Sequence, residues 1–359
     1  MKYIDEYRDK SLVAGLIAEI KKCSKKPVRI MEVCGGHTMA IRKSGIHKIL
    51  PDNISLVSGP GCPVCVTGRS FLDKAVLLSG NPRNIIATYG DLIRVPGSVS
   101  SLEKERAKGA DIRIVYSTLD AVNIAEQNPE KTVIFLGIGF ETTTPPTAVA
   151  VLEAQKRKLN NFFILQSHKT MPPAMGALIT GGSKIDGYIG PGHVSTVAGS
   201  KIYEPLLNKF QVSVAISGFE PVDILQSILL LVRRIENNSP GIDIQYSRAV
   251  SREGNLKAQK FVASVFSPCD DVWRGLGKIN HSGLKLKPEF AEFDAEENFE
   301  LKIFEKPEPK GCICGDILKG MANPVQCKLF GETCTPENPV GACMVSSEGT
   351  CAAYFKYNN

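Results

Sequence analysis

Short runs of β-forming residues alternate with helical stretches from residue 28 to about residue 268. The segments between the runs carry apolar residues at helical spacing, as in PVDILQSILLLVRRIE at 221–236. Alternation of this kind is typical of parallel sheets covered by helices. The sequence therefore predicts an α/β protein with strands at 28–33, 54–58, 84–89, 112–117, 132–138, 162–167, 186–190, 212–217 and 242–247.

The length of 359 residues suggests two or three domains. We expect two Rossmann-like α/β domains, the first over residues 1–130 and the second over 131–280. After residue 280 the chain becomes charged and proline-punctuated, which predicts a linker that wraps the preceding domain. Together with the cysteine-rich end, this linker forms the expected third part, 281–359.

Charge and hydropathy exclude two classes of protein. The net charge is +6, without the basic stripes and interleaved aromatic residues of a nucleic-acid binder. No apolar run reaches the roughly 18 residues that a membrane span needs, and the first ten residues lack a signal core. We therefore expect a cytoplasmic protein that binds neither nucleic acid nor membrane.

Eleven cysteines in such a chain need an explanation, because reducing compartments rarely keep structural disulfides. Four thiolates suffice for an iron-sulfur cluster or a zinc ion, so six cysteines in one segment leave a pair over. Zinc more typically comes with paired C-x2-C knuckles, which this segment lacks. The pattern favours a [4Fe-4S] cluster over zinc or a set of disulfides. The six are Cys312, Cys314, Cys327, Cys334, Cys343 and Cys351.

The stretch GPGCPVCVTG at 59–68 places Cys62 and Cys65 directly after an expected strand. Two thiols at this spacing can close a small disulfide ring and exchange electrons. The alternative is a pair of buried cysteines in a tight turn. A phosphate-binding loop is excluded, because Pro63 and Arg69 stand where that motif needs glycine and lysine.

A third group of candidate residues is EVCGGHT at 32–38, where a strand is expected to pass into a helix. Backbone N–H groups and the helix dipole would favour a thiolate at Cys34. Gly35 and Gly36 keep the approach free of side chains, so Cys34 could act as a nucleophile or as a metal ligand. His37 could join it, or could serve only as a structural hydrogen-bonding residue.

Polar residues also stand at the expected carboxyl ends of later strands, where open α/β sheets bind ligands. They are the residues Glu141, Thr142 and Thr143 of GIGFETTTP and His168 of QSHKTMPPAM. The threonines could equally cap the following helix. We expect these residues, together with His193 of GPGHVSTVAG, to line a cleft.

These stretches together resemble the hydrogenase maturation (formation) protein family HypD. The resemblance spans essentially the whole chain and rests on EVCGGHT, GPGCPVC, GFETTTP and the segment LFGETCTPENPVGACMVSSEGTCAA. It implies two α/β domains that face a cleft, a third domain with a [4Fe-4S] cluster, and a scaffold on which the Fe(CN)2CO unit of [NiFe]-hydrogenase is built. The implied partners are a small HypC-type chaperone and a HypE-type cyanide donor.

The resemblance also implies roles for individual cysteines. Cys34 becomes a ligand of Fe(II) that carries CN and CO, with Cys62 and Cys65 as a nearby redox pair. Cys314 and Cys343 become a disulfide pair beside the cluster. The implied cluster ligands are Cys312, Cys327, Cys334 and Cys351. The competing hypothesis is a [4Fe-4S]-dependent protein disulfide reductase in which Cys34 never binds iron.

Overall fold

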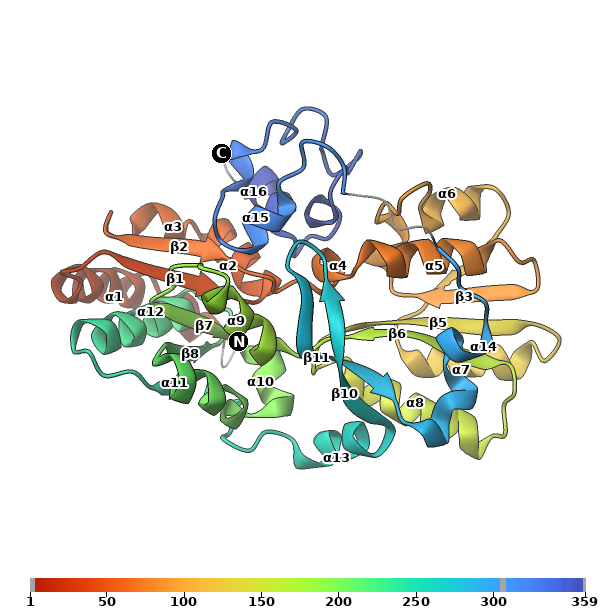
Figure 1. Cartoon of the computed structure of the whole chain (residues 1–359). Helices are drawn as coiled ribbons and strands as arrows, with labels where there is room; N and C mark the ends of the chain where they lie inside the picture. Colours follow the sequence, from red (N-terminus) through yellow and green to blue (C-terminus); the bar gives the residue numbers. More distant parts are fainter. Residues whose placement is uncertain (1–3, 304–307, 358–359) are drawn as a thin grey trace.

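The computed structural model describes residues 4–303 and 308–357 and contains two parallel β-sheets (Figure 1). The first has the strand order β2-β1-β7-β8-β9 and the second the order β4-β3-β5-β6. The first sheet consists of β1 Val28–Glu32, β2 Ile54–Ser58, β7 Gly187–Pro191, β8 Ser213–Ser217 and β9 Ile242–Ile244. The second consists of β3 Asn84–Thr88, β4 Asp111–Ile114, β5 Thr132–Gly139 and β6 Phe162–His168. The predicted α/β class is confirmed, and each expected strand forms.

Helices cover both faces of each sheet, which is why strands such as β3 and β8 are buried along their whole length. The first sheet packs on α1 (Lys10–Cys23), α2 (Gly35–Ser44), α3 (Ile46–Ile49) and α12 (Pro221–Glu236) on one face, and on α9 (Met171–Thr180) and α11 (Glu204–Phe210) on the other. The second packs between α7 (Thr118–Gln127) with α8 (Thr144–Lys156) and α5 (Arg69–Ser79) with α6 (Leu102–Ala107).

The predicted division at residue 130 is wrong for the sheets. It falls directly before β5, yet β5 pairs with β3 in register from Asn84↔Thr132 to Ala87↔Phe135. Likewise β1 pairs with β7, which follows it by more than 150 residues. The chain starts the first sheet, builds the whole second sheet, and then returns to complete the first. A linear reading of alternating elements cannot reveal this return.

An antiparallel hairpin that the sequence analysis did not predict lies between the two sheets (Figure 1). Its strands are β10 (Phe266–Trp273) and β11 (Gly277–Leu286), with a register shift between Cys269 and Asp271. A proline and two adjacent aspartates weaken the β-signal of β10. Lys169, which follows β6 of the second sheet, forms a bridge with Gly283 of the hairpin. Thr67, which follows α4 (Pro63–Val66) in the connection between the two sheets, forms a bridge with Trp273.

The chain after the hairpin packs against the second sheet. Phe293 packs against Phe162, and Phe299 against Phe163. The cysteine-rich tail then lies across the top of the molecule in Figure 1, over the junction of the two sheets. Its helices are α15 (Cys314–Leu318) and α16 (Thr350–Tyr357), and the other helices are α10 (Gly192–Ala198), α13 (Leu256–Val265) and α14 (Ala295–Asn298). Within the described ranges, every helix is too short or too polar to cross a membrane.

Candidate functional site: a row of cysteines

Cys34 lies where β1 passes into α2, as expected, and is the N-cap residue of that helix. Its backbone is extended, with φ −149° and ψ 123°, and its side chain caps no helical N–H group. Cys34 is partly exposed although the residues on either side of it are buried. Cys34 therefore keeps part of its surface exposed at a position fixed by a buried strand and a buried helix end.

The expectation of a thiolate at Cys34 is wrong for the metal-free protein. Burial, followed by the charge of Glu348, raises the pKa of Cys34 to about 12. The N–H groups of Gly36 and His37 act in the predicted direction and lower this pKa, but desolvation outweighs them. Cys34 is thus a thiol at neutral pH, and a bound metal cation would have to displace its proton.

Close packing, rather than open approach, explains the glycines around Cys34. A Cβ on Gly35 would lie 2.3 Å from the carbonyl oxygen of Glu348, and a Cβ on Gly61 would lie 2.2 Å from the nitrogen of Cys34. Two glycines therefore allow the tail and the loop after β2 to press against the Cys34 backbone. Three segments distant in sequence meet at this thiol.

His37 is fully buried, and its contacts are those of a structural hydrogen-bonding residue, the simpler of the two roles considered for it. Its Nε2 lies 3.0 Å from the carbonyl oxygen of Gly218, and its ring stacks on Phe219 at 4.5 Å. The opposite neighbour of Phe219 is His193, at 4.0 Å. Burial lowers the pKa of His37 to about 4, so the ring is neutral. Its Nδ1 is buried without a partner among the described residues.

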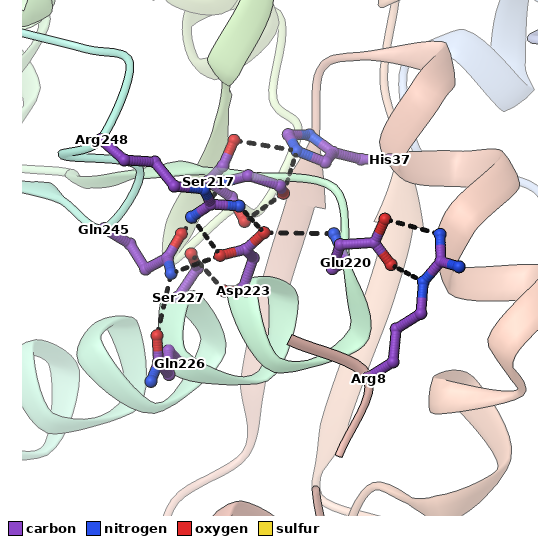
Figure 2. A network of polar contacts seen from close by, with 10 residues as sticks. Arg8, His37, Ser217, Glu220, Asp223, Gln226, Ser227, Gln245 and Arg248 are labelled. Atoms are coloured by element: carbon purple, nitrogen blue, oxygen red, sulfur yellow. Dashed lines mark hydrogen bonds and ion pairs between the residues drawn. The ribbon is translucent and has the colours of Figure 1, made fainter. Parts of the chain in front are cut away.

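Figure 2 shows the polar network that holds the loop beneath His37. The fully buried carboxylate of Asp223 accepts two hydrogen bonds from Arg248, at 2.8 and 2.6 Å, and one from Gln245 at 2.8 Å. The Gln245 side chain in turn accepts the N–H of Gly218 at 3.0 Å. The carbonyl group that contacts His37 is therefore positioned by a buried ion pair.

Cys62 is the N-cap residue of the short helix α4, Cys65 lies within that helix, and both are buried. The N–H of Cys65 donates to the sulfur of Cys62 at 3.3 Å, which brings the two ends of the motif together. The N–H of Arg274 in the hairpin turn donates to the carbonyl of Val66 at 2.9 Å. The hairpin thus fixes the turn that carries both thiols.

The tail extends the row of thiols beyond Cys65. The Cys343 side chain interacts with those of Cys65, Cys314 and Cys351, and the sulfur of Cys65 lies 3.9 Å from the carbonyl oxygen of Ala342. Hydrogen bonds from the neighbouring thiols lower the pKa of Cys343, whereas burial raises that of Cys65. At the other end, Cys62 interacts electrostatically with Cys34.

The four cysteines implied as cluster ligands are only partly assembled. Cys334 accepts the N–H of Val340 at 3.3 Å, and Cys327 lies 3.6 Å from the carbonyl oxygen of Gly311. Cys312 contacts Cys314, and a Cβ on Gly341 would lie within 2.9 Å of both sulfurs. Across residues 4–303 and 308–357, no three potential ligands converge as a metal site does. The thiol donors, with N–H groups aimed at sulfur, still fit a cluster in their chemistry.

The expected cleft residues do not form one group. Glu141 is partly buried and lines an apolar cavity of about 440 Å³ with residues of α10 and α13. Thr142 and Thr143 are also partly buried, and Thr143 donates to the carbonyl of Phe140 at 3.2 Å instead of capping α8. His168 is fully buried, 3.1 Å from Gln166, and so lines no cleft. Exposed His193 lies beside Phe219, as described above.

Sequence reasoning missed the acidic residue Glu348 near Cys34, and Asp91, which contacts the loop that carries it. Glu348 belongs to a tail loop in which Ser346 donates to Asp91 at 2.6 Å and accepts the N–H of Glu348 at 3.3 Å. Burial and the charge of Asp91 raise the pKa of Glu348. Glu348 lies in the cysteine-rich tail and Asp91 lies after β3. These positions in the sequence do not indicate that the fold brings Glu348 to Cys34 and Asp91 to the same loop.

The fold consists of two parallel sheets. A row of thiols runs from partly exposed Cys34 to the cysteine-rich tail. These features define an α/β protein with the donor chemistry for binding metals. The family model HypD, described as the hydrogenase formation hypA family, matches residues 11–358. Hydrogenase maturation factor HypD2 of Bradyrhizobium diazoefficiens is 49% identical, over 99% of this chain and 97% of its own. Hydrogenase maturation factor HypD of Cupriavidus necator is 45% identical over the same shares.

An archaeal relative is similar over the same extent. The putative hydrogenase expression/formation protein of Methanocaldococcus jannaschii is 42% identical, over 97% of this chain and 98% of its own. The chain belongs to the HypD family, and its role is in hydrogenase maturation.

Proposed function

We propose that this protein is the scaffold on which the Fe(CN)2CO group of [NiFe]-hydrogenase is assembled, with the iron held by Cys34. The supporting observation is the row of cysteines that begins at partly exposed Cys34 and continues through Cys62 and Cys65 to Cys343. A HypC-type chaperone supplies a second thiolate to the iron, and a HypE-type partner delivers cyanide. The iron is the cargo of this protein.

The chemistry of a thiol suits this cargo. Cyanide and CO favour low-spin Fe(II), and a soft thiolate can hold such an iron while other positions stay free for incoming ligands. Because the pKa of Cys34 is about 12 without metal, loading releases a proton and weakens as the pH falls.

The remaining thiols pass an electron pair toward Cys34 by disulfide exchange. The thiolate of Cys343 attacks the sulfur of Cys65 in a Cys62–Cys65 disulfide, and Cys62 leaves as a thiolate. Cys314 then attacks Cys343 and releases Cys65. The products are a Cys314–Cys343 disulfide and a Cys62/Cys65 dithiol, so two electrons have moved from the tail to the turn beside Cys34.

The cysteines Cys312, Cys327, Cys334 and Cys351 would hold a [4Fe-4S] cluster, which supplies single electrons when bound. The chain's own contribution is to keep Cys62, Cys65 and Cys343 buried, away from other oxidants and thiols, with partly exposed Cys314 beside Cys343. Among the residues that the structure describes, Cys23 contacts Glu19 and Cys269 lies near Asp271, and neither has a part in this proposal.

A trapping experiment tests the relay. In a Cys62→Ser/Cys314→Ser variant, both thiols that would resolve the exchange intermediate are gone. Mild oxidation with diamide should then give a Cys65–Cys343 disulfide, detected by mass spectrometry of the linked peptides. Adding Cys343→Ala is the matched control and should abolish the link. A Cys65 that oxidises only with external thiols would contradict the relay.

Metal analysis of the protein purified with its small partner separates the scaffold from a disulfide reductase. The scaffold predicts iron beyond that of the cluster, and predicts that Cys34→Ala removes only this excess. A reductase predicts cluster iron alone, with the same trapped disulfide.

A further inference from the structure

A cavity of about 520 Å³ opens at the edge of the first sheet, beside the tail. It is lined by four consecutive residues of β2, 54–57, by the tail segment 320–323, and by side chains that include Arg29, Arg42, His47 and Tyr354. Figure 1 shows β2 at the outer edge of its sheet, with the tail above it. Cys34 and the relay thiols are not part of this lining.

The charged side chains of the cavity are all basic, since neither Asp nor Glu lines it. The Arg42 guanidinium stacks on the Tyr354 ring at 3.5 Å, and Arg29 donates to the carbonyl of Gly320. Within residues 4–303 and 308–357, neither arginine forms an ion pair. Glu32 interacts with the charge of Arg42, but it is buried, bonded to Ser58 at 2.6 Å and outside the lining. The cavity therefore favours an anionic occupant.

The floor of the cavity is a strand with an unused edge. β2 is the terminal strand of its sheet and pairs only with β1. The N–H of Val28 donates to the carbonyl of Asn53, and the N–H of Gly59 to the carbonyl of Glu32, so odd-numbered residues of β2 face β1. In a parallel ladder the alternate residues face the other way. The N–H and C=O of Leu56 therefore point to the open edge.

We propose that this cavity binds an extended, acidic peptide segment of a partner protein, which adds as a strand along β2. An open strand edge supplies backbone hydrogen bonds to such a segment, and flanking side chains select its sequence. Arg29 and Arg42 supply the selection here, because guanidinium groups bind carboxylates with charge-assisted hydrogen bonds. The occupant contacts both the sheet and segment 320–323, so its binding holds the tail against the first sheet. This inference does not depend on the iron scaffold.

Fluorescence anisotropy of a labelled peptide with alternating Glu and Val tests the proposal on the full chain. We expect binding by the wild type, at least a tenfold loss in Arg29→Gln/Arg42→Gln, and no binding of the matching Lys-Val peptide. The control Arg83→Gln/Arg106→Gln removes the same charge from two exposed positions and should bind normally. No binding of the acidic peptide, or equal loss in the control, would overturn the proposal.

Hydrogen exchange separates strand addition from simple anion binding. The amide of Leu56 should become protected when the peptide binds, whereas that of Ser55 is already bonded to β1 and should not change. A Leu56→Pro variant keeps both arginines, lacks the edge donor, and should also lose binding; circular dichroism verifies its fold. Unchanged Leu56 exchange, or displacement of the peptide by equimolar inorganic phosphate, would show a general anion site and refute strand addition.

Discussion

Substituting Gly35 by alanine should loosen the tail from Cys34. The added methyl would lie 2.3 Å from the carbonyl oxygen and 2.6 Å from the Cβ of Glu348, whereas ordinary contact begins at 3.4 Å. The tail loop must therefore retreat by about 1 Å, and overpacking of this kind costs about 1–3 kcal/mol. Alanine regains up to about 1 kcal/mol over glycine in a helix. We predict a net loss of about 1–2 kcal/mol in the free energy of unfolding.

Gly15 offers a matched control within α1, because an added Cβ there meets nothing within 4 Å. Gly15→Ala should stabilise the protein by about 0.5–1 kcal/mol. Urea unfolding under reducing, anaerobic conditions gives both values, and the alkylation rate of Cys34 reports the position of the loop. The rate should rise in Gly35→Ala alone. Equal stabilisation by both substitutions, with unchanged alkylation, would refute this account of the glycine.

Asp223→Asn should lower the free energy of unfolding by about 3–5 kcal/mol, because Arg248 would lose a buried partner. The exposed pair Glu19–Arg233 offers the control. Glu19→Gln should lower the free energy of unfolding by less than about 1 kcal/mol. Burial raises the pKa of Glu141 from 4.5 to about 7, so its folded state keeps a proton that the unfolded state loses. The contribution of Glu141 to the free energy of unfolding is fully present below pH 4.5 and is lost as the pH rises to about 7. Glu141→Gln should remove that loss, so its free energy of unfolding at pH 8 should exceed that of the wild type by up to about 3 kcal/mol. Urea unfolding that gives the same pH dependence of stability for both proteins across this range would contradict the prediction.

Hydrophobic periodicity was enough to predict the strands and the helix at 221–236, because buried parallel strands and amphipathic helices leave strong patterns. It failed for connectivity. Residues 128–131 look like a boundary, yet β4 before them and β5 after them belong to one sheet, in which β3 lies between the two. Strand order depends on packing between distant segments, which a local pattern does not encode. The β10–β11 hairpin was missed because Pro268 and its aspartates conceal the strand signal.

The sequence predicted which residues form the candidate site better than it predicted their protonation and contacts. The spacing of Cys62 and Cys65 and the position of Cys34 follow from local geometry, since a strand end and a tight turn are local features. The pKa of Cys34 does not, because it depends on burial in the folded protein and on the charge of Glu348, more than 300 residues away. Likewise the sandwich of His37, Phe219 and His193 joins three segments, and nothing in any one of them indicates the others.

The central claim is that Cys34 anchors an iron that carries CN and CO. Its most direct test is an infrared spectrum, in the region of the CN and CO stretching bands, of protein purified anaerobically with its small partner. The account predicts both sets of bands in the wild type and their loss in Cys34→Ala. Bands that persist in the variant would contradict the role of Cys34, and their absence from both samples would contradict the iron scaffold itself.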